Sequence, residues 1–303
     1  MTRDVTASIK ARLLNRARQE DGEFELFLVR YACERFLYRL GVSPLRERCI
    51  LKGAGLLTVW MHDPYRATRD VDLLASGASD EASIREIVKT VCAMPCPEDG
   101  LVFDLESLSI LPIRSEEEYQ GQRALLRARL GKARIRVQVD FGFGDAVVPP
   151  AEEADYPTLL EDLPAPRLRI YPQVVTVAEK FQAMVDLGRR NSRMKDFHDI
   201  WALSSEFEFD GGALREAVTA CFERRRMIWT AEAPDALRAA FYSDSSLAAR
   251  GNAHLRAGAF RTSPPADFKA VGERVREFLG PVRKSILAGE GFERSWPPGG
   301  SWQ

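Results

Sequence analysis

Asp70 and Asp72 are the residues of this sequence whose type and spacing most directly suggest chemistry. In a β-strand, alternate side chains point to the same face, so these two carboxylates would lie about 6.6 Å apart along one side of the strand. Carboxylates this close repel each other unless a cation lies between them, and Mg2+ prefers oxygen ligands of this kind. A solvated Asp-x-Asp turn is the alternative, because short motifs often match by chance.

A third carboxylate, Asp140, lies at the end of a predicted strand over residues 133–141. The alternation places apolar residues on one face and Asp140 on the other, together with Arg134, Arg136 and Gln138. If this strand pairs beside Asp70 and Asp72, three acids converge around one or two metal ions. An exposed edge strand with alternating polar residues would give the same pattern.

A glycine turn precedes the first acidic pair and consists of Lys52, Gly53, Ala54 and Gly55. It lies between a predicted strand at 48–52 and a predicted helix at 56–62. Glycines at such a turn allow a phosphate to approach backbone N–H groups and the positive end of the helix. A tight turn that needs small residues is the alternative interpretation.

The second half of the chain contributes Lys180, a basic loop at 188–193, and Asp196 and Asp199 on one face of a predicted helix. Lys180 lies in the first turns of a helix that runs to about residue 187. These charges can serve a phosphate-binding site. They can equally be acids in the first turn of a helix that pair with Lys180 or Arg193.

Composition restricts the class of protein. The chain has 303 residues, 45% of them apolar and 29% charged, which is typical of a globular protein with one large or two ordinary domains. Its formal net charge of -1 excludes a protein that coats nucleic acid by overall charge, but it allows a local basic cleft. The sequence contains neither an apolar run near membrane-span length nor the layout of a secretory signal, so we expect a cytoplasmic protein. The five cysteines lack metal-ligand spacing and are expected to be reduced thiols.

The elements that position these residues fall into two predicted lobes. Helical spacing over residues 8–40 precedes an α/β region, which contains a helix at 80–91 and strands at 101–105, 107–113 and 124–130. The stretch 142–172 is rich in proline and glycine. We therefore predict an α+β domain over residues 1–150, a linker over 151–172 and a helical domain over 173–303. Its last residues, 289–303, are predicted to form a loosely ordered tail, docked if at all through Trp296 or Trp302.

In this order, the motifs resemble the AbiEii nucleotidyltransferase toxins, a group that includes the MenT proteins and belongs to the polymerase-β-like nucleotidyltransferase superfamily. The resemblance covers about residues 45–210. It rests on Leu51-Lys52-Gly53-Ala54-Gly55-Leu56, Arg66-x-Thr68-x-Asp70-Val71-Asp72-Leu73, Asp140, Glu179-Lys180-Phe181-x-Ala183 and Arg193-x-Lys195-Asp196-Phe197-His198-Asp199. One departure is Ala54, because family members are expected to carry Ser or Thr in this turn.

The resemblance implies an α+β fold: a mixed, twisted sheet with flanking helices, a C-terminal helical lobe, and an active site in the groove between them. It assigns Mg2+ to Asp70 and Asp72, with Asp140 as the third acid, and makes Asp196 the essential carboxylate of the helical lobe. Asp140 and Asp196 both stay open as the general base. The expected nucleotide-binding residues are Lys52, Gly53, Ala54, Gly55, Arg66, Thr68, Lys180 and Arg193.

Family members studied as toxins add nucleotides to the 3′ acceptor end of tRNA, which blocks aminoacylation and growth. The resemblance therefore predicts a monomeric, Mg2+-dependent transferase of NMP from NTP to tRNA. It would be the toxin of a bacterial toxin–antitoxin system of the phage-defence type, with a cognate antitoxin partner. Two alternatives stay open: NMP transfer onto a protein or small molecule, and a nucleotide-binding module without catalysis.

Overall fold

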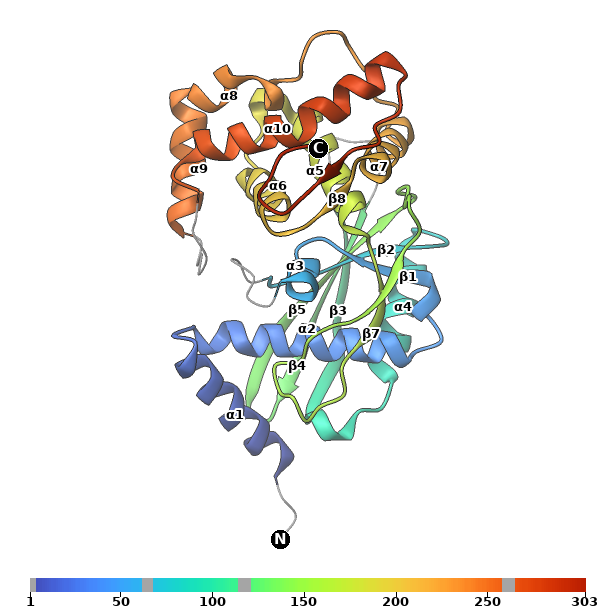
Figure 1. The fold of residues 1–303 in the computed structure, drawn as a ribbon. Helices are drawn as coiled ribbons and strands as arrows, with labels where there is room; N and C mark the ends of the chain where they lie inside the picture. Colours follow the sequence, from blue (N-terminus) through green and yellow to red (C-terminus); the bar gives the residue numbers. More distant parts are fainter. Residues whose placement is uncertain (1–3, 62–67, 114–120, 258–264) are drawn as a thin grey trace. The chain divides into compact units, whose positions relative to one another are not determined.

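The computed structural model describes residues 4–61, 68–113, 121–257 and 265–303. The chain forms two compact units (Figure 1). The first unit comprises residues 1–144 with 152–170, and the second comprises residues 145–151 with 171–303. A sheet organises the first unit and helices organise the second, as the resemblance implied.

The first unit is built on a mixed sheet of seven strands in the order β3-β4-β5-β2-β1-β7-β6. The strands are β1 (Cys49–Lys52), β2 (Val71–Ala75), β3 (Leu101–Ile113), β4 (Gly121–Leu130), β5 (Ala133–Phe143), β6 (Glu152–Asp155) and β7 (Arg167–Ile170). The pairs β2–β5 and β1–β7 are parallel, and the other neighbours are antiparallel. We predicted two strands over 101–113. They form the single strand β3, whose register with β4 shifts between Asp104 and Ser109.

Four helices accompany this sheet: α1 (Val5–Gln19), α2 (Phe24–Val42), α3 (Gly55–Trp60) and α4 (Glu81–Ala93). Helix α2 contacts β5 and β7, and α4 contacts β3 and β4. The side chains of Ile135, Val137 and Val139 on β5 are buried, as their alternation predicts. The residues between them are partly or fully exposed. One face of β5 therefore belongs to the core, and the other carries the polar residues.

The stretch that we expected to be a linker, residues 151–172, contains β6 and β7. Strand β7 pairs in parallel with β1, and β6 pairs with β7 at the edge of the sheet. We did not predict these two short strands because prolines flank them, and because the partner of β7, strand β1, lies more than 100 residues earlier in the chain. The chain passes between the two units at about residues 144, 151 and 170.

The second unit consists mainly of helices: α5 (Gln173–Leu187), α6 (Met194–Glu206), α7 (Gly211–Arg224), α8 (Ala239–Ser243), α9 (Ser245–Ala257) and α10 (Phe268–Ala288). Aromatic contacts hold the helices together, and the rings of Phe197 and Phe241 stack with centroids 5.4 Å apart. Among the described helices, none combines the length and the apolar composition that a membrane span requires.

The C-terminal residues, predicted to form a loose tail, are docked on the second unit. Residues Ser295–Trp296 form β9, which pairs with β8 (Phe209–Asp210). The Trp296 ring is fully buried and its Nε1 donates to the carbonyl of Ser204 at 2.7 Å. Trp302 stacks on Phe278 with centroids 5.6 Å apart. Large aromatic rings bury enough area to hold a segment of low intrinsic structure.

Candidate functional site

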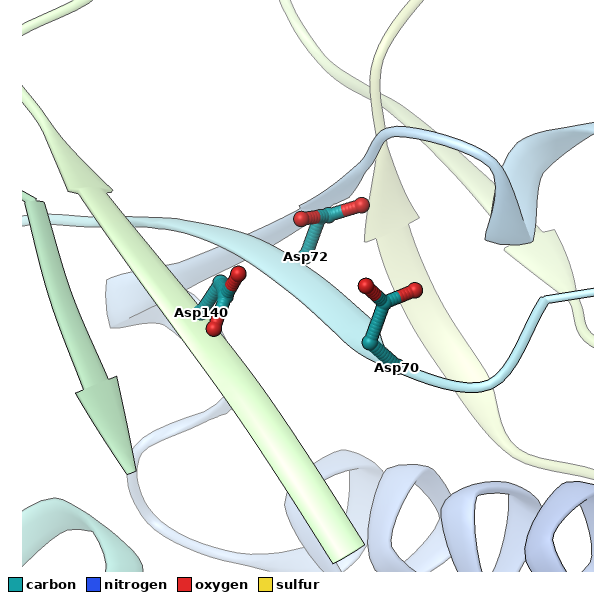
Figure 2. Close-up of side chains that lie close together, drawn as sticks. All are labelled: Asp70, Asp72 and Asp140. Carbon is teal, nitrogen blue, oxygen red and sulfur yellow. The ribbon is translucent and has the colours of Figure 1, made fainter. Parts of the chain in front are cut away.

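The carboxylates of Asp70, Asp72 and Asp140 converge on the polar side of the first unit's sheet (Figure 2). Strands β2 and β5 pair in parallel with Asp72 directly opposite Asp140, while Asp70 lies just before β2. One oxygen of each residue lies within 4.8 Å of the other two. The predicted convergence of the three acids is confirmed, and we call them the acidic triad.

Neighbouring side chains orient two members of the acidic triad. The Thr68 hydroxyl donates to Asp70 Oδ1 at 2.8 Å. Arg123, on β4, holds Asp140 through two hydrogen bonds, from Nε at 2.8 Å and from Nη2 at 2.7 Å. The bond to Asp140 raises the pKa of Arg123, and the charges of Asp70 and Asp72 add to this effect. The carboxylates are therefore held in place before any ligand arrives.

The acidic triad fits a divalent metal ion. All three residues are partly exposed, so a hydrated ion can reach them. Their carboxylate oxygens are the ligands that hard divalent cations prefer. The donor set and the spacing therefore suit a cation of the Mg2+ type.

One residue of the glycine turn, Gly53, lies against the acidic triad. Gly53 adopts a φ of +69°, and a Cβ atom at this residue would lie 2.0 Å from Asp72 Oδ2. Only glycine allows the chain to pass this close to the carboxylate. Lys52 lies opposite Asp72 in the β1–β2 register. Ala54 caps α3 and Gly55 begins it, but this helix has only six residues. Residue 53 must therefore be glycine because the chain passes close to Asp72 at this point.

A second group of charges, which we call the lysine cluster, lies in the second unit and consists of Lys180, Arg193, Asp196 and Asp199. Lys180 Nζ donates to Asp196 Oδ1 at 3.1 Å and also to Asp199 Oδ2. Arg193 Nε lies 2.7 Å from Asp196 Oδ2. Both carboxylates are fully buried, whereas the Arg193 side chain is 51% exposed. The ion pairs expected from the sequence are present.

Burial and charge act in opposite directions on these two carboxyls. Burial by itself would raise the pKa of Asp196, but Lys180 and Arg193 hold it below its usual value. Burial raises the pKa of Asp199 well above its usual value. The two acids of one helix face therefore differ in how readily they release a proton.

One residue of the predicted site lies outside the residues that the structure describes, and two residues near the site had no role in the prediction. Arg66 lies outside the described residues. Arg123 was missed because the predicted strand started at residue 124, three positions after the start of β4 at Gly121. Asp199 was noted as a neighbour of Asp196 but received no role. The i, i+3 spacing was the available signal, and burial of the pair could not be deduced from it.

Comparison with known proteins identifies a family and similar folds. The model of the family described as "Nucleotidyl transferase AbiEii toxin, Type IV TA system" matches residues 35–288. The crystal structure of JHP933 from Helicobacter pylori covers 84% of this chain and 90% of its own, with 14% identity and a TM-score of 0.47. A candidate nucleotidyltransferase from H. pylori covers 85% of this chain and 94% of its own, also with 14% identity and a TM-score of 0.47. No curated protein gives a significant match.

Proposed function

This chain belongs to the nucleotidyl transferase AbiEii toxin family of type IV toxin–antitoxin systems, and we propose that it transfers NMP from an NTP to the 3′ end of tRNA. The reaction is Mg2+-dependent and the product is a tRNA that no longer accepts its amino acid. Expression of the chain then arrests growth, and a cognate antitoxin counteracts it. In a cell under phage attack, this arrest serves as defence.

The observation that carries the proposal is the acidic triad. Nucleotidyl transfer forms a bond between an acceptor hydroxyl oxygen and the α-phosphorus, and breaks the bond from that phosphorus to pyrophosphate. When bound, a divalent cation would neutralise charge on the α-phosphate and on the leaving pyrophosphate. Asp70, Asp72 and Asp140 would hold it, while Thr68 and Arg123 keep Asp70 and Asp140 in position.

The proton of the acceptor hydroxyl needs a base. Asp140 and Asp196 were the two candidates. Both are paired with cations, Asp196 with Lys180 and Arg193 and Asp140 with Arg123, so exposure decides between them. Asp196 is fully buried. Asp140 is partly exposed and lies beside the other two acids. We therefore assign Asp140 to proton removal, because a base must be within reach of a solvated hydroxyl.

Cations are also needed for the triphosphate. We assign Lys52, Lys180 and Arg193 to this role, with Lys52 located opposite Asp72 in the first unit. Arg193 is the most exposed member of the lysine cluster, and its planar guanidinium can bind a phosphate through two hydrogen bonds. Lys180 is held by two carboxylates, which fix its ammonium group in one place.

The test uses purified protein, Mg2+, total tRNA and each of the four NTPs labelled at the α-phosphate. We expect label at the 3′ end of tRNA with the parent chain and at least about a 100-fold loss with Asp72→Asn. Glu86→Gln, an exposed position on α4, is the matched control and should retain full activity. No label on tRNA with any NTP would refute the proposal.

Two other outcomes correspond to the alternative functions. Label on protein or on a small molecule, but not on tRNA, would identify a different acceptor. A non-catalytic module would show NTP binding without label, and the Asp72→Asn variant would arrest growth as strongly as the parent. The conjunction of three converging acids favours catalysis, because NTP binding alone does not require them.

A further inference from the structure

The exposed side of strands β4 and β5 carries four arginines that the transfer chemistry does not use. In the antiparallel register, Arg127 lies directly opposite Arg136, and Arg129 lies directly opposite Arg134. All four residues are exposed. We call these four residues the arginine ladder. In the sheet of Figure 1, β5 lies next to β2, and β4 lies on the other side of β5.

This arrangement is unfavourable for the isolated protein. Like charges directly opposite each other on a sheet repel and destabilise the pair. Within the described residues, none of these four guanidinium groups makes a hydrogen bond or an ion pair to another side chain. Asp104 is the acid that lies opposite Arg127 on β3. Two unpaired like-charge pairs on one surface indicate that a polyanion compensates them.

The ladder continues the line of the acidic triad along β5. Arg136 and Arg134 lie four and six residues before Asp140 on the same strand face. At the usual rise per residue, they lie about 13 Å and about 20 Å from Asp140. A chain of phosphates that begins at the triad could therefore run along this strand.

We propose that the arginine ladder binds the phosphodiester backbone of the RNA whose 3′ end enters the acidic triad. The choice of RNA rests on the proposed function. Arginine suits this role because its planar, permanently charged group binds phosphate oxygens in pairs. Phosphate contacts position a nucleic acid without reading its sequence. The net charge of -1 makes this a local concentration of charge on one surface.

The test compares two variants with the same change in charge. The ladder variant carries Arg127→Gln, Arg129→Gln, Arg134→Gln and Arg136→Gln. The control variant replaces four exposed cations elsewhere with Gln: Lys10, Arg18, Lys89 and Arg256. Binding is measured by fluorescence anisotropy in EDTA and without NTP, so the result does not depend on catalysis. The probes are total tRNA, uridine oligonucleotides of three and twelve residues, and poly-L-glutamate, at several salt concentrations.

We expect the ladder variant to bind tRNA and the twelve-residue oligonucleotide at least about 10-fold more weakly than the parent at ~0.15 M salt. The slope of log affinity against log salt should fall by about three to four, one for each lost phosphate contact. The control variant should stay close to the parent. The three-residue oligonucleotide has too few phosphates to contact all four arginines, so its affinity should fall less in the ladder variant than that of the twelve-residue oligonucleotide.

Equal losses in the two variants would overturn the proposal, since overall charge would then explain the binding. Binding of poly-L-glutamate that depends on the ladder, with RNA binding that does not, would also overturn it and would indicate an acidic protein partner. The thermal unfolding midpoint of the ladder variant should equal or exceed that of the parent, which excludes misfolding. Ladder-dependent RNA binding without any transfer would refute the proposed function and leave this inference intact.

Discussion

The acidic triad and the lysine cluster both contain aspartates, but these differ in the cations that pair with them and in their exposure to solvent. The triad has three partly exposed carboxylates, and the Arg123 guanidinium holds one of them, Asp140. The lysine cluster has two fully buried carboxylates, with Lys180 bonded to both and Arg193 bonded to Asp196. The acids of the first arrangement are open to solvent, whereas those of the second are paired inside the protein.

This difference separates two uses of the same side chain. Partly exposed acids can bind a cation from solution, and water can still reach them. Buried acids must be paired inside the protein, because an isolated buried charge is very costly. The triad is therefore organised to receive a cation, whereas the lysine cluster fixes Lys180 and Arg193, the two cations that we assign to the triphosphate. Four changes test this distinction.

The largest expected effect is on stability, from Lys180→Met. This change leaves two buried carboxyls without their shared cation and should reduce the free energy of unfolding of the second unit by about 3–5 kcal/mol. Four of the five tryptophans lie in that unit, so fluorescence during urea unfolding will follow it. Lys269→Met, at an exposed position, is the control. A loss below about 1 kcal/mol would mean that the cluster is no more than a surface ion pair.

The next effect is on activity, from Gly53→Ala. The added methyl group would overlap Asp72 Oδ2 and the positive φ would be strained, so Asp72 must move. We expect transfer to fall at least about 100-fold, as for Asp72→Asn. Gly280→Ala is the matched control, because its added Cβ meets no atom within 4 Å. It should keep full activity and stabilise α10 slightly. Unchanged transfer in Gly53→Ala would show that Asp72 does not need its present position.

The third effect is a pH dependence from His198, which lies between Asp196 and Asp199 on α6. Burial lowers its pKa to about 4, with a smaller contribution from His254. The unfolded chain binds a proton near pH 6.5, so this residue makes the protein less stable as pH falls from 6.5 towards 4. The loss between pH 7 and pH 5 is about 2 kcal/mol. This loss of stability should be absent from the His198→Asn variant.

Asp199 acts in the opposite direction, because its raised pKa favours the folded state at low pH. The informative quantity is therefore the difference between parent and His198→Asn, both of which contain Asp199. Unfolding in urea at several pH values measures it. If the two proteins lost stability in parallel, water would have access to His198 and the region around the lysine cluster would not be dry.

The two clusters also differ in what the sequence could predict. The period-2 alternation of β5 and the Asp-x-Asp spacing predicted which strand face carries Asp72 and Asp140, since strand geometry fixes this. Their convergence also required β5 to pair with β2, which was a condition of the prediction and which the structure shows. Arg123 was missed because the predicted strand began at residue 124, whereas β4 begins at Gly121. Burial of Asp196 and Asp199 could not be predicted, because it depends on helices that are distant in the sequence.

The sequence was likewise insufficient to predict strand β6 at the edge of the sheet and the C-terminal segment. Strong periodicity predicted the central strands and most helices. Strand β6 (Glu152–Asp155) has three acids in four residues and no apolar alternation, so its pairing with β7 had no local signal. The C-terminal segment likewise has little intrinsic structure and is held by Trp296 and Trp302. Tertiary contacts, which local sequence does not encode, determine both.

The smallest predicted effect is on metal affinity, from Arg123→Gln. Arg123 competes with a cation for Asp140, because it occupies both carboxylate oxygens. Its removal should tighten binding of Mn2+, used as the probe, about fivefold, which is ~1 kcal/mol for a partly exposed charge. Arg85→Gln, on α4, serves as the control, and titration followed by electron paramagnetic resonance measures the free ion. Weaker binding in Arg123→Gln would show that Arg123 mainly holds Asp140 in the geometry that the ion requires, and the triad would then resemble the lysine cluster in depending on an internal cation.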